Sequence, residues 1–389
     1  LINNNWISSI SPSGGTPGYI NSNREKLSPY PIVLKSFYPT KENQLSLFFN
    51  VPIESIETPL KHKITDNHIL INIPKIDSNS IDSILIINMK TCYDVDFEEL
   101  NLKYGFPKIP KSGDIVINEL LFNPDNDGSD FIEIYNYSSK TVDLSKLSFC
   151  RRNNNAEFEN AFILKANPFL LLPNEYFVVC SDKLWLEEKF PRATNIIESD
   201  IPPMNNDSGN ILLLTSSAEI IDEVNYKESW HFTELIKNEN VSLEKINPAQ
   251  TNTASSWTSA SFSHNYATPG YVNSNFIQKK TINNNFVLEN KIISPNGDSY
   301  NDQLIVHYNL SNSKWKAKIR VINSSGITIK TIHPNIYLGN SGIINWDGRL
   351  ENKLQIKPGI YALHIGAYNS QSHEKINKKI LFYVNGNLK

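Results

Sequence analysis

GDIVINELLFNPDNDGSDFIEIYNYSSKTVDLSKLSF (residues 113–149) contains three short apolar segments separated by polar turns. IVINELLF and FIEIYN flank the acidic turn NPDNDGSD, and VDLSKLSF follows another short turn. The apolar segments are rich in β-branched and aromatic residues, while Asn, Asp, Gly, Pro and Ser occupy the turns. The stretch therefore predicts three consecutive β-strands.

Similar segments recur along most of the 389 residues, and helical periodicity is almost absent. Examples are IVLKSFY, LSLFFNV, HILINI, SILIINM, YFVVCS and NILLLTS. The exception is SDKLWLEEKF (181–190), where Ser181 or Asp182 is placed to cap a helix and Pro191 to end it. The length predicts about two to four domains, and 40% hydrophobic residues are enough to build their cores. The expected fold class is all-β, with tandem sandwiches.

An eight-residue motif occurs twice, as TPGYINSN at 16–23 and as TPGYVNSN at 268–275. A tryptophan precedes each copy at nearly the same spacing, Trp6 in the first and Trp257 in the second. We interpret the pair as an internal repeat. The second copy follows a long segment and the first does not. The expectation is that the first copy lost its body, or that the chain is the tail of a longer protein.

Residues 112–275 resemble a lamin-tail domain, which is an immunoglobulin-like sandwich. The opening signature is carried by Asn118, Glu119, Asp130, Glu133, Asn136, Leu144 and Leu147. The closing signature is carried by Ser242, Leu243, Glu244, Trp257, Thr268, Pro269, Gly270 and Asn273, with Lys245 in place of the usual Arg. The resemblance implies that residues 1–27 are the end of an upstream copy of the same domain.

Linkers rich in Pro, Gly and polar residues suggest four units, at 1–27, 28–111, 112–275 and 276–389. The second unit resembles bacterial immunoglobulin-like domains, although Tyr93 and Asp94 replace the usual residues near its end. The fourth resembles immunoglobulin-like modules of the flagellar-hook-cap type and the gliding-associated C-terminal domain that serves type IX secretion. The residues that carry this resemblance are Pro295, Asn296, Gly297, Asp298, Asn301, Asp302, Trp346, Asp347, Gly348, Pro358, Gly359 and Tyr361. INSSG (322–326) departs from the turn of the secretion-signal domain.

Two acidic turns have the oxygen density of a calcium site. One contains Asp125, Asp127 and Asp130, and the other contains Asp298, Asn301 and Asp302. The first lacks the spacing and terminal Glu of an EF-hand loop, and its alternative is a solvated turn. The alternative for the second is an Asx-rich turn that satisfies its own hydrogen bonds. Glu119, Glu133 and Asp130 also form a candidate acid–base pair or cation site. Their alternative role is structural, in tying strand ends to backbone donors. No other cofactor is expected.

Catalytic motifs with a fixed spacing are absent from the sequence, including nucleotide-binding loops and metalloprotease helices. His231 and His264 are the histidines that best fit a site, although satisfied histidines are far commoner. Cys150 and Cys180 are expected on strands, as buried thiols or as a disulfide. The net charge is −3, and IQKKT and INKKI are short, isolated basic runs, so no nucleic-acid partner is expected. No apolar run is long enough for a membrane-spanning helix.

The sequence therefore predicts a non-enzymatic protein of the bacterial cell surface. Its expected role is adhesive or scaffolding, as an accessory subunit of an outer-membrane or secretion-linked protein assembly in a Bacteroidota-type bacterium. Trp230, Tyr226, Tyr266 and Tyr271 are candidate anchors for partners, or residues that pack domain against domain. One alternative is a targeting tail of a secreted hydrolase or nuclease whose catalytic domain lies upstream. Another is carbohydrate binding by one sandwich.

Overall fold

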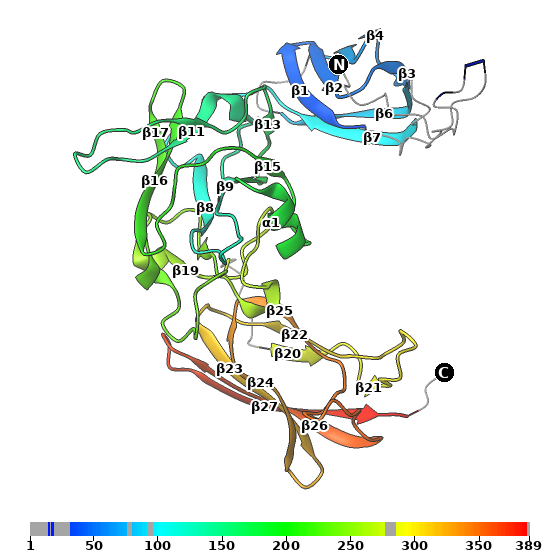
Figure 1. Ribbon diagram of the computed structural model, residues 1–389, viewed down its shortest axis with the longest axis vertical. Coiled ribbons are helices and arrows are strands. Elements are labelled where there is room, and N and C mark those ends of the chain that lie inside the picture. The colour runs from blue at the N-terminus through cyan, green and yellow to red at the C-terminus, as the bar shows by residue number, and fades with distance from the viewer. Residues whose placement is uncertain are drawn as a thin grey trace. The chain divides into compact units, whose positions relative to one another are not determined.

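A computed structural model describes residues 15, 17, 18, 32–75, 80–91, 96–276 and 285–386 of the chain. Their regular secondary structure is almost entirely β-strand (Figure 1), which confirms the all-β fold class. They divide into two compact units, Leu1–Phe106 and Pro107–Lys389. None of the described helices has the length and apolar character needed to span a membrane. Most of the first TPGYINSN copy lies outside the described residues, as do Trp6, Cys92, Tyr93, Asp94 and the IQKKT segment at 277–281.

The first unit contains two antiparallel sheets, in the order β1-β2-β5-β4 and β3-β6-β7. Its strands are β1 (Leu34–Lys41), β2 (Gln44–Phe49), β3 (Ile53–Glu57), β4 (His62–Thr65), β5 (His68–Asn72), β6 (Asp82–Thr91) and β7 (Asp96–Tyr104). Alternate residues are buried, as a sandwich requires: Ile69 and Ile71 of β5 are fully buried, while their neighbours are not. The turn into β5 uses Asp66 in a left-handed conformation, which aspartate tolerates.

The second unit begins with a sandwich whose larger sheet has the order β15-β14-β9-β8-β18-β19. The facing sheet has the order β12-β11-β16-β17, and β10 pairs with β13 beside it. The bounds are β8 (Ile115–Leu121), β9 (Phe131–Asn136), β10 (Val142–Asp143), β11 (Leu147–Cys150), β12 (Phe162–Ile163), β13 (Leu170–Leu171), β14 (Tyr176–Cys180), β15 (Ile196–Glu198), β16 (Ser208–Thr215), β17 (Ile220–Lys227), β18 (Leu243–Lys245) and β19 (Trp257–Ser259). The strands predicted in 113–149 are thus present as β8, β9 and β11, together with the short β10.

The strand β8 is buried on both faces, because it lies in the interior of the six-stranded sheet. Ile117 and Leu120 point into the core between the sheets. Leu121 belongs to a second cluster, with Phe131 and Leu186. A register shift in the pairing of β8 with β9 lies between Ile117 and Glu119. Glu119, the motif glutamate of β8, therefore lies next to this irregularity.

The predicted helix is present as α1 (Lys183–Lys189). Asp182 is the N-cap, and its side chain accepts a hydrogen bond from the backbone N–H of Trp185. Ser181 instead contacts the hydroxyl group of Ser129 at 2.9 Å. Leu186 faces the second cluster and is fully buried. Four short 3-10 helices complete the sandwich: η1 (Leu144–Lys146), η2 (Glu228–Trp230), η3 (Ala254–Ser256) and η4 (Phe262–His264).

The C-terminal sandwich packs a sheet of order β20-β22-β25 against one of order β21-β27-β26-β23-β24. Its strands are β20 (Asn285–Leu288), β21 (Ile292–Ile293), β22 (Leu304–Asn309), β23 (Trp315–Asn323), β24 (Thr328–Leu338), β25 (Ser341–Trp346), β26 (Gly359–Asn369) and β27 (Lys375–Val384). The long strands β23, β24, β26 and β27 run side by side (Figure 1). Trp315 and Phe382 are fully buried in its core. This core is separate from that of the preceding sandwich, although both belong to one compact unit, so the division at 275/276 stays a prediction.

Candidate functional site

Three glutamates lie side by side on neighbouring strands of the six-stranded sheet. The register pairs Glu119 of β8 with Glu133 of β9 on one side and with Glu244 of β18 on the other. All three side chains are fully buried. A row of acidic side chains in a protein interior needs partners for every oxygen, because an unpaired buried carboxylate is very costly.

The second copy of the repeat supplies donors to all three glutamates, of which Glu119 and Glu244 are described first. The backbone N–H of Thr268 donates to Glu119 at 2.8 Å, and the hydroxyl group of Ser242 donates to the same carboxyl group. The backbone N–H groups of Ser274 and Asn275 donate to Glu244 at 3.0 Å and 3.1 Å. The side chains of both residues also donate to Glu244. The repeat is therefore held to the sheet through buried carboxyl groups.

The Thr268 hydroxyl group lies between two carboxyl groups. Its oxygen is 3.0 Å from Oε2 of Glu119 and 2.8 Å from Oε1 of Glu244. A hydroxyl group has one hydrogen, so it donates that hydrogen to one of the two carboxyl groups or shares it between both. The Thr268 hydroxyl group therefore links the two carboxyl groups.

Burial and mutual repulsion both raise the pKa values of these carboxyl groups. Burial raises the pKa of Glu119 to about 8, and the nearby charge of Glu244 adds to the effect. Burial likewise raises the pKa of Glu133 well above its usual range, with Glu119 as the next cause. Burial also raises the pKa of Glu244, against the hydrogen bonds from Ser274, Thr268 and Asn275. The raised pKa values favour the protonated form of these carboxyl groups.

Glu133 is bound by an amide and by a turn. Asn118 donates to it at 2.7 Å, and the backbone N–H of Gly270 donates at 2.6 Å. Gly270 has φ +86°, and a Cβ there would lie 2.1 Å from the carbonyl oxygen of Thr194. Only glycine fits this position. The Pro269-Gly270 turn, itself fully buried, thus brings a backbone donor to the third glutamate.

The other residues of the lamin-tail signature also form internal contacts. Asn273 accepts from Asn118 at 2.7 Å and donates to the carbonyl group of Lys245 at 2.9 Å. Asn136 is fully buried, and it donates to the carbonyl group of Lys140 at 2.7 Å. Trp257 is also fully buried, and its Nε1 donates to Asn252 at 3.1 Å. These contacts match the structural role considered for the motif, rather than an accessible acid–base site.

The end of the repeat also contacts the C-terminal sandwich. The hydroxyl group of Tyr337 donates to Oδ1 of Asn275 at 3.1 Å and lies 3.0 Å from the hydroxyl group of Thr258. The backbone N–H of Asn340 donates to the carbonyl group of Ser274 at 2.8 Å. Tyr337 is almost fully buried. Asn275 therefore binds Glu244 in its own sandwich and Tyr337 in the next.

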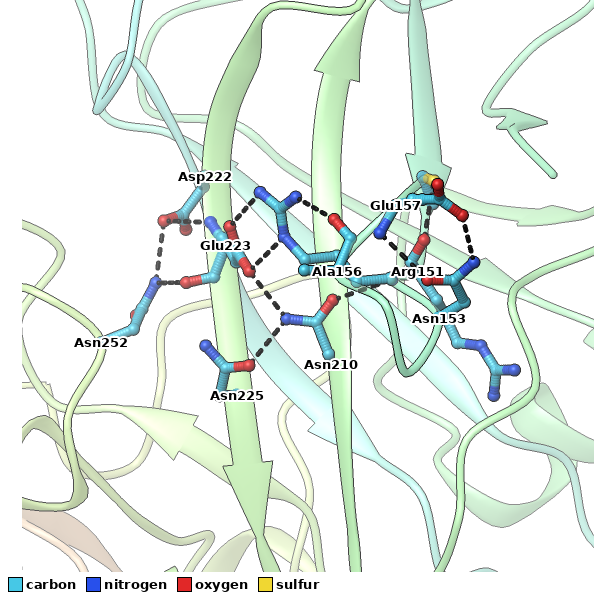
Figure 2. Close-up of polar contacts among 11 residues, drawn as sticks. Arg151, Asn153, Ala156, Glu157, Asn210, Asp222, Glu223, Asn225 and Asn252 are labelled. Atoms are coloured by element: carbon cyan, nitrogen blue, oxygen red, sulfur yellow. Dashed lines mark hydrogen bonds and ion pairs between the residues drawn. The ribbon is translucent and has the colours of Figure 1, made fainter. Parts of the chain in front are cut away.

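A second polar network crosses the surface of β16 and β17. Figure 2 shows Asn210 between Glu223 and Asn225, with its amide donating to them at 2.9 Å and 2.8 Å. Arg152 binds both carboxylate oxygens of Glu223, at 3.0 Å and 3.1 Å, and the carbonyl group of Ala156 at 3.0 Å. Bidentate arginine contacts of this kind fix geometry. The network therefore fastens the 151–159 loop to the sheet.

The network continues inward from Glu223 (Figure 2). Asn252 donates to Asp222 at 2.8 Å and to the carbonyl group of Glu223 at 2.9 Å. Asp222 in turn accepts from the backbone N–H of Ile117 at 2.8 Å. Lys245, which replaces the usual arginine, donates to Asn252 at 2.5 Å and is almost fully buried. The Lys245 ammonium group also lies 5.8 Å from the centroid of the Trp257 ring, so a lysine fills this position through an amide and an aromatic contact.

The first acidic turn is held by internal donors. Lys189 and Asn240 each bind Oδ2 of Asp125 at 3.0 Å, and the hydrogen bond from Lys189 lowers the pKa of Asp125. Asp127 is exposed, while burial raises the pKa of Asp130 to about 6. In the described part of the chain, no three His, Cys, Asp or Glu residues are arranged to hold a metal. The calcium interpretation of this turn stays a prediction.

The second acidic turn uses its side chains to close itself. Asp302 accepts from the backbone N–H groups of Asn296, Gly297 and Ser299, at 2.9, 2.8 and 2.7 Å. These bonds lower the pKa of Asp302. Asn301 accepts from Asn290 at 2.9 Å, and Asp298 accepts from the backbone N–H of Tyr300 at the same distance. The contacts are those of a self-satisfied turn, and calcium binding here also stays a prediction.

The C-terminal motif residues form a tight hairpin. Nε1 of Trp346 donates to the carbonyl group of Arg349 at 3.0 Å, and Asp347 accepts from the Arg349 backbone at 3.0 Å. Gly348 has φ +75°, and a Cβ there would lie 2.7 Å from Pro295. Pro358 and Gly359 lead into β26, which begins at Gly359. These residues have structural roles in the fold.

Both candidate histidines lie beside serine hydroxyl groups; His231 is buried and His264 is half-buried. Nδ1 of His231 lies 2.9 Å from Oγ of Ser259, and Nδ1 of His264 lies 3.0 Å from Oγ of Ser263. Burial lowers the pKa of each imidazole to about 4. Nε2 of His231 is buried without a hydrogen-bond partner. Neither ring is hydrogen-bonded to a carboxylate in the part of the chain that the structure describes, so neither pair is arranged as a triad.

The aromatic residues predicted as anchors have different environments. Tyr226 is 1% exposed and belongs to the core of its own sandwich, so its prediction as an anchor or as domain packing was wrong. Trp230 packs partly buried against the same core, and Tyr271 is partly buried under Arg192 at 4.7 Å. Tyr266 is partly buried and lines a hollow described below. Cys150 and Cys180 end strands β11 and β14 as buried free thiols.

Sequence reasoning missed the contacts that join distant segments. It did not single out Asn275 or Tyr337, which are 62 residues apart. It also missed the pairing of Arg152 with Glu223, 71 residues apart. The only available signal was the second NSN of the repeat, because a strictly repeated polar tripeptide suggests fixed contacts.

Residues 109–228 match the family model of the Lamin Tail Domain. This range includes the opening signature, and the closing signature lies beyond it. The structure joins the two, since β18 and β19 complete the sheet that β8 and β9 begin. No curated protein matches the sequence.

Several solved structures are similar to the chain at low identity. Dimeric latent PorU from Porphyromonas gingivalis is 8% identical with a TM-score of 0.20, covering 91% of this chain and 34% of PorU. PorZ, described as an essential bacterial surface component of the type-IX secretion system of the same bacterium, is 8% identical with a TM-score of 0.22, covering 90% of this chain and 45% of PorZ. A tetra-tandem repeat from the extending region of a large adhesion protein is 8% identical with a TM-score of 0.19, covering 92% of this chain and 99% of that one. The chain thus spans about a third of PorU and under half of PorZ, and TM-scores this low establish no common domain arrangement.

Proposed function

We propose that this chain, with its lamin-tail match at 109–228, is a non-catalytic scaffolding or adhesive protein of the bacterial cell surface. It would act as an accessory subunit of an outer-membrane assembly. The observation that supports this most is that the polar side chains of the motif are buried and hydrogen-bonded inside the protein. Glu119, Glu133 and Glu244 are sealed inside their sandwich, and Asn275 continues the same hydrogen-bond network to the next sandwich.

A catalytic carboxyl group must reach a substrate, directly or through one water molecule. The three motif glutamates are fully buried and accept hydrogen bonds from the repeat. Their arrangement fits the fastening of a chain segment better than it fits turnover. The expected location on the outer membrane rests on the resemblance of the sequence to surface proteins of Bacteroidota-type bacteria.

A hollow beside the junction of the two sandwiches is the best candidate for the partner contact. It has a volume of about 360 Å³ and is lined by Phe232, Leu235, Ile236, Tyr266, Ile336 and Lys316, among others. Ile236 is 87% exposed at its rim. Interface energy concentrates where aromatic and aliphatic side chains enter such hollows. We therefore assign the protein partner to this face.

The test is gentle detergent extraction of the tagged native protein, followed by identification and weighing of the species that co-purify with it. The expected result is a complex of fixed stoichiometry with an outer-membrane protein. An Ile236→Asp variant should lose that partner. The matched control is Leu354→Asp, because Leu354 is also well exposed but lies in another loop.

Two results would contradict the proposal. Recovery of the protein alone, with no stable partner under any mild extraction, would exclude the subunit role. Recovery as the tail of a larger polypeptide with hydrolase or nuclease activity would place the function in that catalytic part instead.

A further inference from the structure

One face of the five-stranded C-terminal sheet is turned away from the core. Along β27, Phe382 and Val384 are buried, while Lys379, Leu381 and Tyr383 are exposed. This alternation is that of a strand with one covered face and one solvated face. The register continues the solvated face across β26 and β23.

This solvated face is basic. The strands β21, β23, β24, β26 and β27 contain no Asp or Glu. The register pairs alternate residues of β26 with three cations of β23, namely Lys316, Lys318 and Arg320. On its other side, the same face of β26 is paired with Lys375 and Lys379 of β27. Lys316 forms an ion pair with Glu234 at 2.6 Å. Within the described residues, the other four cations have no ion-pair partner. A basic face of this kind was not expected from the sequence, where these cations appear in short separate runs.

Three of these cations line a shallow hollow in the sheet. It has a volume of about 420 Å³, and its lining includes Lys316, Lys318, His364, Gly366, Tyr368 and Lys375. Gly366 lies opposite Lys318 in the middle of the basic rows. The nearest neighbouring atom to a Cβ built there would be 4.0 Å away. The glycine therefore leaves space at the centre of the positive charge.

The other end of the same face is apolar and exposed. Tyr383 is paired with Ile360 on one side and with Ile292 on the other. Leu381 lies two residues before Tyr383 on β27, so it shares the face. The four side chains are between 45% and 63% exposed. Clustered exposed aliphatic side chains mark an interaction site.

We propose that this face binds the surface of an anionic lipid bilayer. The lysines and Arg320 would contact lipid phosphate groups, and Leu381, Tyr383, Ile360 and Ile292 would enter the boundary between headgroups and acyl chains. Basic residues beside exposed aliphatic and aromatic residues form the pattern of peripheral membrane binding. A nucleic acid or an acidic polysaccharide would use the cations but would leave the aliphatic end without a partner. For this reason the lipid surface is favoured.

Co-sedimentation of the full chain with vesicles tests the proposal. The vesicles contain either equal phosphatidylglycerol and phosphatidylcholine or phosphatidylcholine alone. The expected result is binding to the anionic vesicles only, weakened by salt. Neutralising Lys318, Lys375 and Lys379 together as Lys→Gln should weaken binding by about fivefold for each lysine removed. The control makes the same change at Lys111, Lys227 and Lys237, which are exposed elsewhere, and should bind as the parent does.

A second variant separates charge from apolar contact. Leu381→Ser with Tyr383→Ser keeps every cation, so binding should persist at low salt but fall more steeply than the parent's when salt is raised. Circular dichroism and thermal unfolding confirm that each variant is folded. Equal binding to both vesicle types, equal loss in the two lysine variants, or retention on DNA or heparin without vesicle binding would each overturn the proposal. Because no protein partner is needed, this result is independent of the scaffold test.

Discussion

At the scale of single residues, the TPGYVNSN motif holds the sandwich together through one hydroxyl group, one backbone N–H group and the absence of one Cβ atom. The Thr268 hydroxyl group bridges Glu119 and Glu244, and the backbone N–H of Gly270 reaches Glu133. The absent Cβ of Gly270 allows the carbonyl group of Thr194 to approach. Each of these features gives a separate prediction.

Gly270→Ala should strongly destabilise the sandwich, because the new Cβ would meet the carbonyl oxygen of Thr194 at 2.1 Å in a backbone with φ +86°. We expect a loss of at least about 3 kcal/mol in the free energy of unfolding, measured with denaturant. Gly113→Ala is the control, since Gly113 has φ +83° but no atom within 4 Å of its Cβ position. It should cost only about 1 kcal/mol. Equal costs would contradict the close-approach argument.

Thr268→Val should remove the bridge between two carboxyl groups and leave both facing an apolar methyl group. The expected loss is about 1–3 kcal/mol in the free energy of unfolding. Thr268→Ser keeps the hydroxyl group and should lose much less. A valine variant as stable as the serine variant would mean that the hydroxyl group does not bridge the carboxyl groups.

At the scale of elements, the row of glutamates on β9, β8 and β18 makes stability depend on pH. A carboxyl group whose pKa is higher in the folded state than in the unfolded state stabilises the fold when protonated. This stabilisation is fully present below the pKa of the group in the unfolded state. It is lost as the pH rises through the pKa of the group in the folded state. For Glu119 this window extends from about 4.5 to about 8. His231 and His264 act oppositely, because their lowered pKa destabilises the fold as pH falls below about 6.5.

Between pH 8 and pH 6.5, folding raises the affinity of Glu119 for a proton, so the free energy of unfolding should rise as the solution is acidified. The slope is about 1.4 kcal/mol per pH unit for each proton taken up on folding. Glu119→Gln should flatten this slope, as measured by denaturant unfolding at several pH values. Glu157→Gln, on an exposed loop, is the control. A parent protein whose stability falls over this interval would show that the buried carboxyl groups are ionised.

The sequence predicted these elements well where local pattern dominates. The strands of 113–149 and the helix capped by Asp182 follow from short-range periodicity and capping. The motif residues Glu119 and Glu133 were identified, but their partners Thr268 and Gly270 lie 149 and 137 residues away, and no local signal encodes such pairing. Tyr226 was misassigned because alternation along β17 cannot reveal which face meets the second sheet. The basic face was missed because three separate strands compose it.

At the scale of the whole second unit, the buried residue Tyr337 joins the two sandwiches. Tyr337 contacts Thr258 and Asn275 through its hydroxyl group and stacks on Phe232 with ring centroids 4.5 Å apart. Burial raises its pKa, so the hydroxyl group stays protonated. This hydroxyl group is one of several contacts across the junction, beside the hydrogen bond from Asn340 to Ser274 and the ion pair of Lys316 with Glu234.

Tyr337→Phe should uncouple the unfolding of the two sandwiches by leaving Asn275 and Thr258 without this partner. Calorimetry is expected to show two transitions where the parent shows one, with about 1–3 kcal/mol lost at the junction. Tyr361→Phe removes a hydroxyl group that bonds the Lys357 carbonyl group within one loop, and it should leave the transition whole. If both variants unfold as the parent does, the junction hydrogen bonds contribute nothing to coupling.

The bonds of Asn275 also determine how the chain would carry a pulling force. Its side chain donates to Glu244 on β18 at 3.1 Å and to the carbonyl group of Ser259 on β19 at 2.9 Å. Tension applied at residue 276 is therefore shared by two neighbouring strands, and it does not peel the outer strand away alone. Because two strands share the load, a larger force is needed to extend the chain at this point. A sandwich that ends in this way is suited to withstand a load applied at its C-terminal end.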